Sequence, residues 1–138
     1  MKYVLDTNAV SALMKAEGRF VGRLRATARA DLLIPQPVIA EIAYGIERLP
    51  RSRRRDALAG RFDLVRAELA RAPWTDTVSE RFGFVKAELE GRGERGERIV
   101  DFDIAVAAHA LAEGAVLVTA NLEHMARVPG LTVEDWTA

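Results

Sequence analysis

A short apolar run, Val116-Leu117-Val118 followed by Thr119, constrains the fold more than any other part of the sequence. It lacks the alternation of apolar and polar residues that marks a half-exposed strand, so it predicts a strand buried on both faces. Residues 2–5 and 32–34 are also short and mainly apolar, and turn-forming residues follow each of them. Strands of this kind are typical of parallel sheets that helices cover.

Helical patterns lie between these runs. Pro37 opens a helix that ends before Pro50, with apolar residues on one face at positions 39, 42, 46 and 49. Ser52 is a capping residue for a second helix with apolar positions 58, 62, 65 and 69. Further helices are predicted over 9–15, 75–90 and 101–112. A glycine-rich loop is predicted over 91–97. Residues 72–74 are predicted to form a connection or an edge strand, and residues 131–133 a last strand. The alternation predicts an α/β fold with a mostly parallel sheet.

The composition excludes several classes of protein. The chain has 138 residues, which is the length of one domain, 1–138. It contains no cysteine, so a disulfide scaffold, a thiol nucleophile and a thiolate zinc site are excluded, and two histidines are too few for a polyhistidine metal centre. Lysine plus arginine equal aspartate plus glutamate at 20 each, which argues against a protein that coats nucleic acid. No membrane span or signal peptide is evident, so we expect a cytoplasmic protein without a membrane partner.

Polar residues follow the predicted strands where a parallel α/β sheet carries its site. Ligands bind beyond the carboxyl ends of such strands, at the point where the strand order reverses. Asp6 follows the first strand, and Asn121 follows Thr119 at the end of the buried one. A single Asp in this place is more often a turn former or cap than a functional group. Thr7 and Thr119 are hydroxyl donors that could orient carboxylates, and Thr7 or Asn8 is a candidate cap for the helix over 9–15.

Three further acids lie on the predicted helices. Glu41 is beside the apolar stripe of its helix, close in angle to Tyr44 and Arg48, so it is either part of a solvated face or a carboxylate that needs a partner. Asp101 and Asp103 open the helix over 101–112 and are separated by about 200° around its axis, so one helix cannot point both into one site. We assign Asp103, on the face of small residues, to the site and Asp101 to the helix cap.

Converging carboxylates and an amide are suited to a hard divalent cation. Carboxylates that approach one another repel until a cation joins them. Mg²⁺ takes oxygen ligands, and it commonly uses one or two carboxylates together with waters and substrate phosphates. It then stabilises charge on the phosphate and lowers the pKa of a bound water. The set of candidates therefore indicates hydrolysis of a phosphodiester.

The segment from residue 48 to residue 71 is basic, with eight arginines against three acids and a net charge of +5. A run of charge is usually a solvated face, but it can also follow a phosphate backbone. The candidate RNA-binding residues are the densest part of this segment: Arg48, Arg51, Arg53, Arg54 and Arg55.

Taken in order along the chain, these motifs resemble the PIN-domain ribonucleases, and in particular the VapC-type toxins of bacterial toxin–antitoxin modules. The resemblance covers essentially the whole chain and rests on four stretches: Leu5-Asp6-Thr7-Asn8, residues 39–46 around Glu41, residues 103–110, and Val118-Thr119-Ala120-Asn121 with the closing residues 130–136.

The resemblance implies a PIN-like fold with a central parallel sheet of about five strands and helices on both faces. It implies that Asp6, Glu41 and Asp103 surround Mg²⁺ or Mn²⁺, with Asn121 where many members carry a fourth acid. A neutral residue there leaves the site less negative and puts tight binding of a second metal in doubt. It further implies metal-dependent cleavage of RNA, a homodimer or a higher assembly, and silencing by a small cognate antitoxin of the VapB type.

Two alternatives come from other classes of protein. An aspartyl phosphotransferase also carries an Asp after its first strand, but it usually needs a second acid two residues later, where this chain has Asn8. A non-catalytic module would use the acids as caps and the arginine-rich face to bind nucleic acid or protein. Divalent metal should not stabilise such a module, and it should leave RNA intact.

Overall fold

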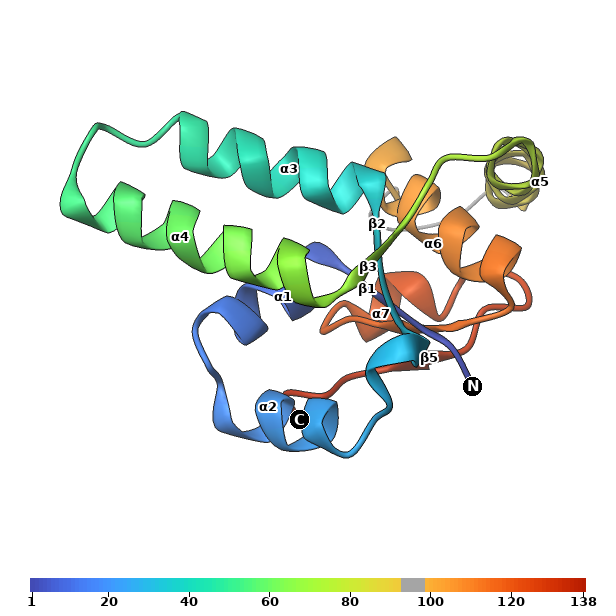
Figure 1. The fold of residues 1–138 in the computed structure, drawn as a ribbon. Helices are drawn as coiled ribbons and strands as arrows, with labels where there is room; N and C mark the ends of the chain where they lie inside the picture. Colours follow the sequence, from blue (N-terminus) through green and yellow to red (C-terminus); the bar gives the residue numbers. More distant parts are fainter. Residues whose placement is uncertain (93–98) are drawn as a thin grey trace.

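The computed structural model describes residues 1–92 and 99–138, and its centre is a five-stranded sheet (Figure 1). The strands are β1 (Tyr3–Leu5), β2 (Leu32–Pro35), β3 (Ala70–Ala72), β4 (Val116–Val118) and β5 (Val133–Glu134). Neighbouring strands pair in parallel in the order β3-β2-β1-β4-β5. The predicted α/β class with a five-stranded parallel sheet is therefore confirmed, and residues 70–72 form an edge strand.

Helices connect consecutive strands and cover both faces of this sheet. They are α1 (Thr7–Met14), α2 (Gly18–Arg25), α3 (Gln36–Glu47), α4 (Arg53–Glu68), α5 (Asp76–Gly91), α6 (Asp101–Glu113) and α7 (Leu122–Met125), with a 3₁₀ turn at Arg29–Asp31. The chain steps outward from β1 to β3 and then returns to β4, so right-handed crossovers place α1–α2 and α5–α6 on opposite faces. Figure 1 shows α2 and α6 on opposite sides of the strands. Within the described ranges, no helix is long and apolar enough to cross a membrane.

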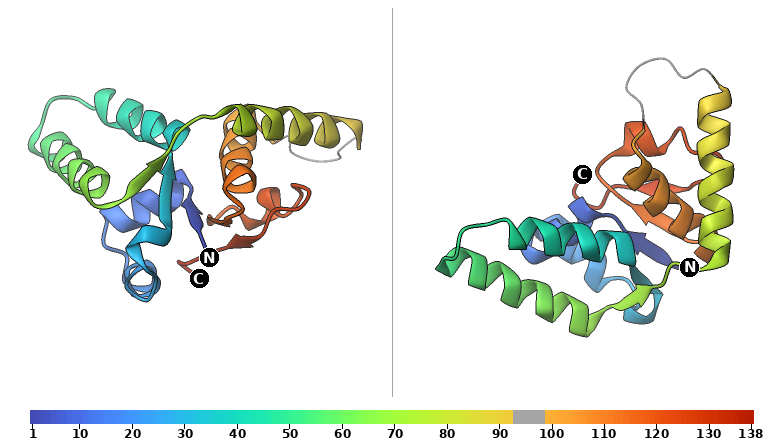
Figure 2. Two further views of the ribbon diagram at one scale, coloured as in Figure 1. Left: turned by 45° about the vertical axis from the view of Figure 1, so that its right-hand side comes forward. Right: turned by 90° about the horizontal axis from the view of Figure 1, so that it is seen from above.

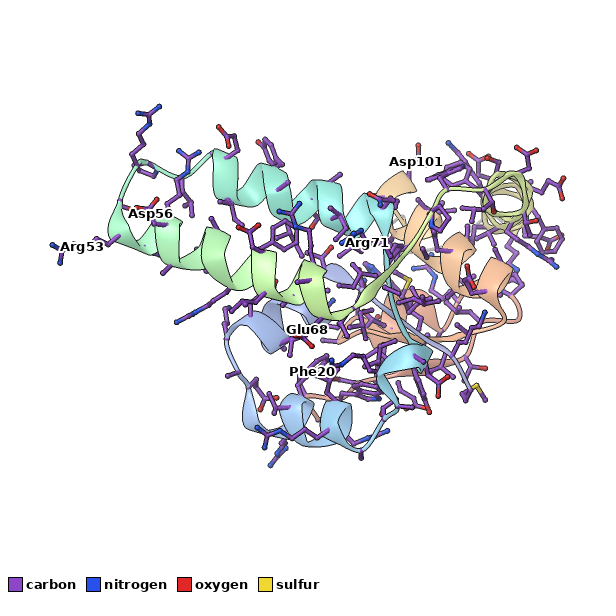
Figure 3. The ribbon with its side chains drawn as sticks, viewed as in Figure 1. Phe20, Arg53, Asp56, Glu68, Arg71 and Asp101 are labelled. Carbon is purple, nitrogen blue, oxygen red and sulfur yellow. The ribbon has the colours of Figure 1, made fainter. Side chains whose placement is uncertain are left out.

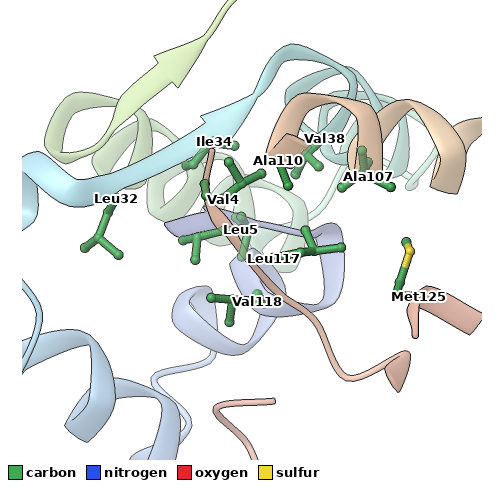
Figure 4. Packing of buried hydrophobic residues seen from close by; sticks show 14 of the residues in the cluster. Val4, Leu5, Leu32, Ile34, Val38, Ala107, Ala110, Leu117, Val118 and Met125 are labelled. Carbon is green, nitrogen blue, oxygen red and sulfur yellow. The ribbon is translucent and has the colours of Figure 1, made fainter. Parts of the chain in front are cut away.

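The hydrophobic core lies on both sides of β1, β2 and β4. Val4, Leu117 and Ile34 of the strands are fully buried, and α6 packs against them through Ala107 and Ala110 (Figure 4). Every residue of α6 from position 104 to position 110 is buried, because this helix lies between the sheet and α5. The small side chains let α6 approach the strands closely and bring its N-terminal end to the edge of the sheet where β1 and β4 end.

Helices α3 and α4 form a helical hairpin that projects away from the sheet, as both views of Figure 2 show. Each helix buries one stripe, which includes Val38 and Ile42 in α3 and Phe62 and Val65 in α4. Ser52 caps α4 as predicted, because its Oγ accepts a hydrogen bond of 3.1 Å from the Arg55 backbone N–H. The outer half of the hairpin is solvent-exposed on most sides, and it carries the densest group of arginines.

Two predicted helix caps are wrong. Helix α1 begins at Thr7, so its cap is Asp6 rather than Thr7 or Asn8. Helix α6 begins at Asp101, and the residue before it, Val100, is the cap and has extended backbone. The Asp101 side chain makes no capping hydrogen bond; it is exposed and pairs with Lys86 of α5 at 3.1 Å. The predicted loop over 91–97 lies almost wholly outside the described residues, because the structure describes residues up to 92 and again from 99.

Candidate active site

Asp6 is fixed where β1 gives way to α1. Its backbone N–H continues the sheet by donating to the Val118 carbonyl at 3.0 Å. Its Oδ1 accepts the Thr7 N–H at 2.7 Å, and its Oδ2 accepts the Thr119 hydroxyl at 2.9 Å. The residue is only 4% exposed. The carboxylate is therefore held in one orientation, with its position set by two neighbouring strands.

Asn8 and Thr119 link the ends of β1 and β4 into one polar network. The Asn8 Nδ2 donates to the Thr119 Oγ1 at 3.3 Å and lies 3.5 Å from the Asp6 Oδ2, and its Oδ1 accepts the Ala120 N–H at 2.8 Å. The Thr119 Oγ1 also accepts the Asn121 N–H at 3.0 Å. These bonds make Thr119 and Asn8 positioning residues for the Asp6 carboxylate.

Asp6, Glu41 and Asp103 line one open cavity of about 710 Å³, together with Asn121. They come from the end of β1, from α3 and from the first turn of α6, and Asn121 comes from the segment after β4. Glu41 is exposed, Asp103 is half-buried and Asp6 is buried, so the three acids lie at increasing depth. The other lining residues are Thr7, Asn8, Ser11, Ala12, Lys15, Glu17 and Phe102.

The three carboxyl groups resist ionisation in this environment. Burial raises the pKa of Asp6, against the effect of its hydrogen bonds to Thr7, Thr119 and Asn8, which favour the charged form. Burial also raises the pKa of Glu41, and the negative charges of Asp6 and Asp103 add to that effect. The pKa of Asp103 is raised by burial and by the charge of Asp6. Three acids whose charges oppose one another form a site that favours a cation.

This donor set fits a hydrated hard cation better than a closed metal cage. Among the residues that the structure describes, no group of three or more acids or histidines lies close enough together to hold a metal ion. Mg²⁺ does not require such a group, since it keeps several waters and commonly takes one or two carboxylates from the protein. Asp6, Asp103 and Glu41 are the acids of the cavity that could hold such an ion directly or through water.

The structure separates the five candidate arginines. Arg55 is held by Glu47 at 3.0 Å and donates to the Leu49 carbonyl at 3.3 Å, so it stabilises the hairpin. Arg48 and Arg54 line a second cavity that adjoins the acid cavity. The five arginines therefore differ in their surroundings, and their expected role in RNA binding stays a prediction.

The other two arginines lie at the exposed turn that joins α3 to α4. Arg51 belongs to this turn, and Arg53 is the first residue of α4. Figure 3 shows Arg53 pointing away from the body of the molecule, while Asp101 lies near α5 and outside the acid cavity. Neither Arg51 nor Arg53 lines the cavity that contains the three carboxylates.

Sequence reasoning missed Lys15 and His124. Lys15 follows α1 directly and lines the acid cavity. His124 lies on α7, where its ring nitrogen is 3.4 Å from the Asn121 Nδ2, and its charge lowers the pKa of Asp103. The spacing of three residues between Asn121 and His124 was a signal for the second. No signal marked Lys15, because its place depends on how α1 ends.

Comparison with known proteins identifies the family. Residues 3–131 match the family model described as the PIN domain. The chain belongs to the PIN domain family. It is 30% identical to "Ribonuclease VapC2" of Rickettsia felis, over 99% of this chain and 98% of that protein. It is 28% identical to "tRNA(fMet)-specific endonuclease VapC" of Shigella flexneri, over 99% of each protein.

The fold is also that of a solved member of this group. The structure of VapBC2 from Rickettsia felis, bound to a DNA fragment from its promoter, superposes with a TM-score of 0.87 at 28% identity and 99% coverage of both chains. The resemblance that the motifs indicated, to PIN-domain proteins of the VapC type, is confirmed.

Proposed function

We propose that this chain is a metal-dependent endoribonuclease that acts as the toxin of a toxin–antitoxin pair. The observation that carries the proposal is the acid cavity: Asp6, Glu41 and Asp103 come from three different elements and line it together. Its place, at the carboxyl ends of β1 and β4 where the strand order reverses, is where α/β sheets carry their sites. The VapC relatives named as ribonucleases support the reaction class.

The residues in and around the acid cavity have separate roles in the proposed hydrolysis. Asp6 and Asp103 would hold a divalent ion, Mg²⁺ or Mn²⁺, which would supply positive charge to the phosphate and lower the pKa of a bound water. Glu41, the most open acid, orients the attacking water and accepts its proton, which its raised pKa favours. Thr119 and Asn8 keep the Asp6 carboxylate aimed into the cavity, and Asn121 is a neutral neighbour that limits the negative charge.

The names of the relatives support a substrate and a partner for this chain. RNA is the substrate, and tRNA is the first class to test because a relative of similar length carries the name of a tRNA(fMet)-specific endonuclease. A VapB-like antitoxin is the inhibitor, since the solved relative is a VapBC2 complex. We expect a homodimer, or a higher assembly with the antitoxin, that works in the cytoplasm.

The test is cleavage of an end-labelled tRNA(fMet) transcript by the antitoxin-free chain, with Mn²⁺ or Mg²⁺ and with EDTA. Asp6→Asn is the decisive variant, because Asn retains a helix-capping oxygen while it removes the charge. We expect cleavage that needs metal and falls by roughly 10³-fold or more in the variant, the scale of loss for an essential catalytic group. Equal cleavage by folded Asp6→Asn protein contradicts the proposed site. Failure of the wild-type protein to cut either this transcript or total bacterial RNA contradicts the proposed activity.

A further inference from the structure

A second cavity of about 670 Å³ lies between α1 and the α3–α4 hairpin. It shares Thr7, Ser11, Lys15 and Glu41 with the acid cavity, so the two are continuous and meet at Glu41. We call this second cavity the hairpin groove. If one backbone bond of a polymer is held at the three carboxylates, the units next to that bond can lie in the hairpin groove.

The hairpin groove combines an apolar floor with unpaired positive charge. Its floor consists of Met14, Ile42, Ile46, Leu49 and Leu58. Lys15, Arg48 and Arg54 line it, and within the described part of the chain none of these three makes an ion pair. Some cations elsewhere in the molecule are paired, as Arg66 is with Asp63 at 2.6 Å. The groove is therefore electropositive beside a cavity that is electronegative.

Tyr44 is the aromatic residue of the groove. It is 66% exposed although it is large and apolar. On α3 it follows Glu41 by three residues and precedes Arg48 by four, so the three side chains lie along one face of the helix. Glu41, Tyr44 and Arg48 therefore lie in a line about 10 Å long on this face of the helix.

We propose that the hairpin groove binds the single-stranded RNA next to the cleaved bond, with a base stacked on Tyr44 and phosphates paired with Lys15, Arg48 and Arg54. This inference rests on the proposed ribonuclease function. An exposed aromatic ring together with a cationic groove is the usual means by which proteins bind single-stranded nucleic acid. Charge complementarity favours RNA, and continuity with the acid cavity places it next to the carboxylates. An acidic peptide or a second copy of the chain is a competing occupant.

The experiment measures binding of two fluorescent RNAs, the tRNA(fMet) transcript and a short unstructured oligonucleotide, to full-length Asp6→Asn protein across a range of salt concentration. The test variants are Tyr44→Ala, Tyr44→Phe and Arg54→Ala in that background. The matched controls lie on α5, away from the hairpin in Figures 1 and 2: Phe84→Ala, which removes another exposed ring, and Arg81→Ala, which removes another exposed charge.

We expect two separate signatures. Tyr44→Ala should weaken RNA binding about five-fold or more with an unchanged salt slope, and Tyr44→Phe should restore binding, because stacking needs the ring and not the hydroxyl. Arg54→Ala should reduce the slope of log affinity against log salt by about 0.7, the change for one lost phosphate contact on a single strand. Neither Phe84→Ala nor Arg81→Ala should change either quantity.

Three results overturn the inference. One is RNA affinity that Tyr44→Ala and Arg54→Ala leave unchanged. Another is equal loss in the α5 controls, which would mean that any exposed ring or charge has this effect. The last is a change of oligomeric state by light scattering that accounts for the whole loss in Tyr44→Ala, since the groove would then hold a second copy. Wild-type protein that cuts RNA while these variants bind normally refutes the groove alone, whereas wild-type protein that cuts no RNA refutes the proposed function.

Discussion

The acid cavity and the hairpin groove meet at Glu41, yet the protein holds their charged groups in opposite ways. Asp6 is buried and fixed by hydrogen bonds from Thr7, the first residue of α1, and Thr119, which directly follows β4. Arg48 and Arg54 are exposed side chains on a projecting hairpin and make no ion pair in the described structure. Under the proposed function, the Asp6 carboxylate keeps a fixed geometry at the edge of the sheet, and the exposed arginines of the hairpin can adapt to a polymer.

The two regions also differ in how they affect the free energy of unfolding. An exposed arginine keeps its water and costs little, whereas burial and mutual repulsion raise the pKa values of Asp6, Glu41 and Asp103. A carboxyl group with a raised folded-state pKa favours folding below its unfolded pKa, and this contribution is lost as the pH rises through the folded value. At neutral pH the acid cavity therefore destabilises the metal-free protein, and the hairpin groove does not.

The largest expected effect on stability comes from adding metal. Mn²⁺ at about 100 times its Kd should stabilise the wild-type protein by about 2.7 kcal/mol, because it binds only the folded cavity. Thermal melts with Mn²⁺ and with EDTA measure the shift. Asp6→Asn should lose most of it, whereas Asp56→Asn, which removes an exposed acid on α4, should keep it. An equal shift in all three proteins would mean that the metal binds elsewhere.

A smaller effect is expected when one acid of the cavity is neutralised without metal. Asp103→Asn should raise the melting temperature by a few degrees at neutral pH, because it removes a charge that burial and Asp6 disfavour. The gain should shrink towards the unfolded pKa of an Asp, about 3.9, where the wild-type carboxyl is protonated. Melts in EDTA across this pH range test it. A melting temperature below wild type at neutral pH would contradict the assigned electrostatics.

The smallest effect concerns the turn at the rim of the acid cavity. Ala16 lies between Lys15 and Glu17, which both line the cavity, and its φ of 54° is in the left-handed region that disfavours residues with a Cβ. Ala16→Gly should stabilise the protein by about 1 kcal/mol, as chemical denaturation would show. Gly114→Ala, at a φ of 62°, is the reverse change and should destabilise it. A change of the same sign in both variants would count against a conformational cause.

The fold and the acids of the cavity could be predicted from the sequence because both depend on local patterns. Buried apolar runs indicate parallel strands, and the end of each such strand marks the edge where Asp6 and Asn121 lie. Asp103 was distinguished from Asp101 by the face it occupies on a helix, and the structure places only Asp103 in the cavity. Both lie in the first turn of α6, so their angular separation was enough to decide between them.

The helix caps and the groove were not accessible in the same way. A cap depends on the backbone angles of the residue before the helix, and Val100 is extended without offering a side-chain acceptor. The arginines between positions 48 and 55 are alike in sequence, and the turn between α3 and α4 decides which enter the groove and which reach solvent or Glu47. Lys15 joins them only because α1 ends beside α3.

We propose that the acid cavity performs the chemistry and that the hairpin groove binds the substrate. The most direct test of this separation is single-turnover cleavage of the labelled tRNA(fMet) transcript at increasing enzyme concentration. Glu41→Gln should lower the cleavage rate at saturation and leave the half-saturating concentration unchanged. Arg54→Ala should raise the half-saturating concentration and leave the rate at saturation unchanged. Glu88→Gln, an exposed acid on α5 outside both cavities, controls for the loss of an acid. If Glu41→Gln and Arg54→Ala change the same parameter, the separation of chemistry from substrate binding is contradicted.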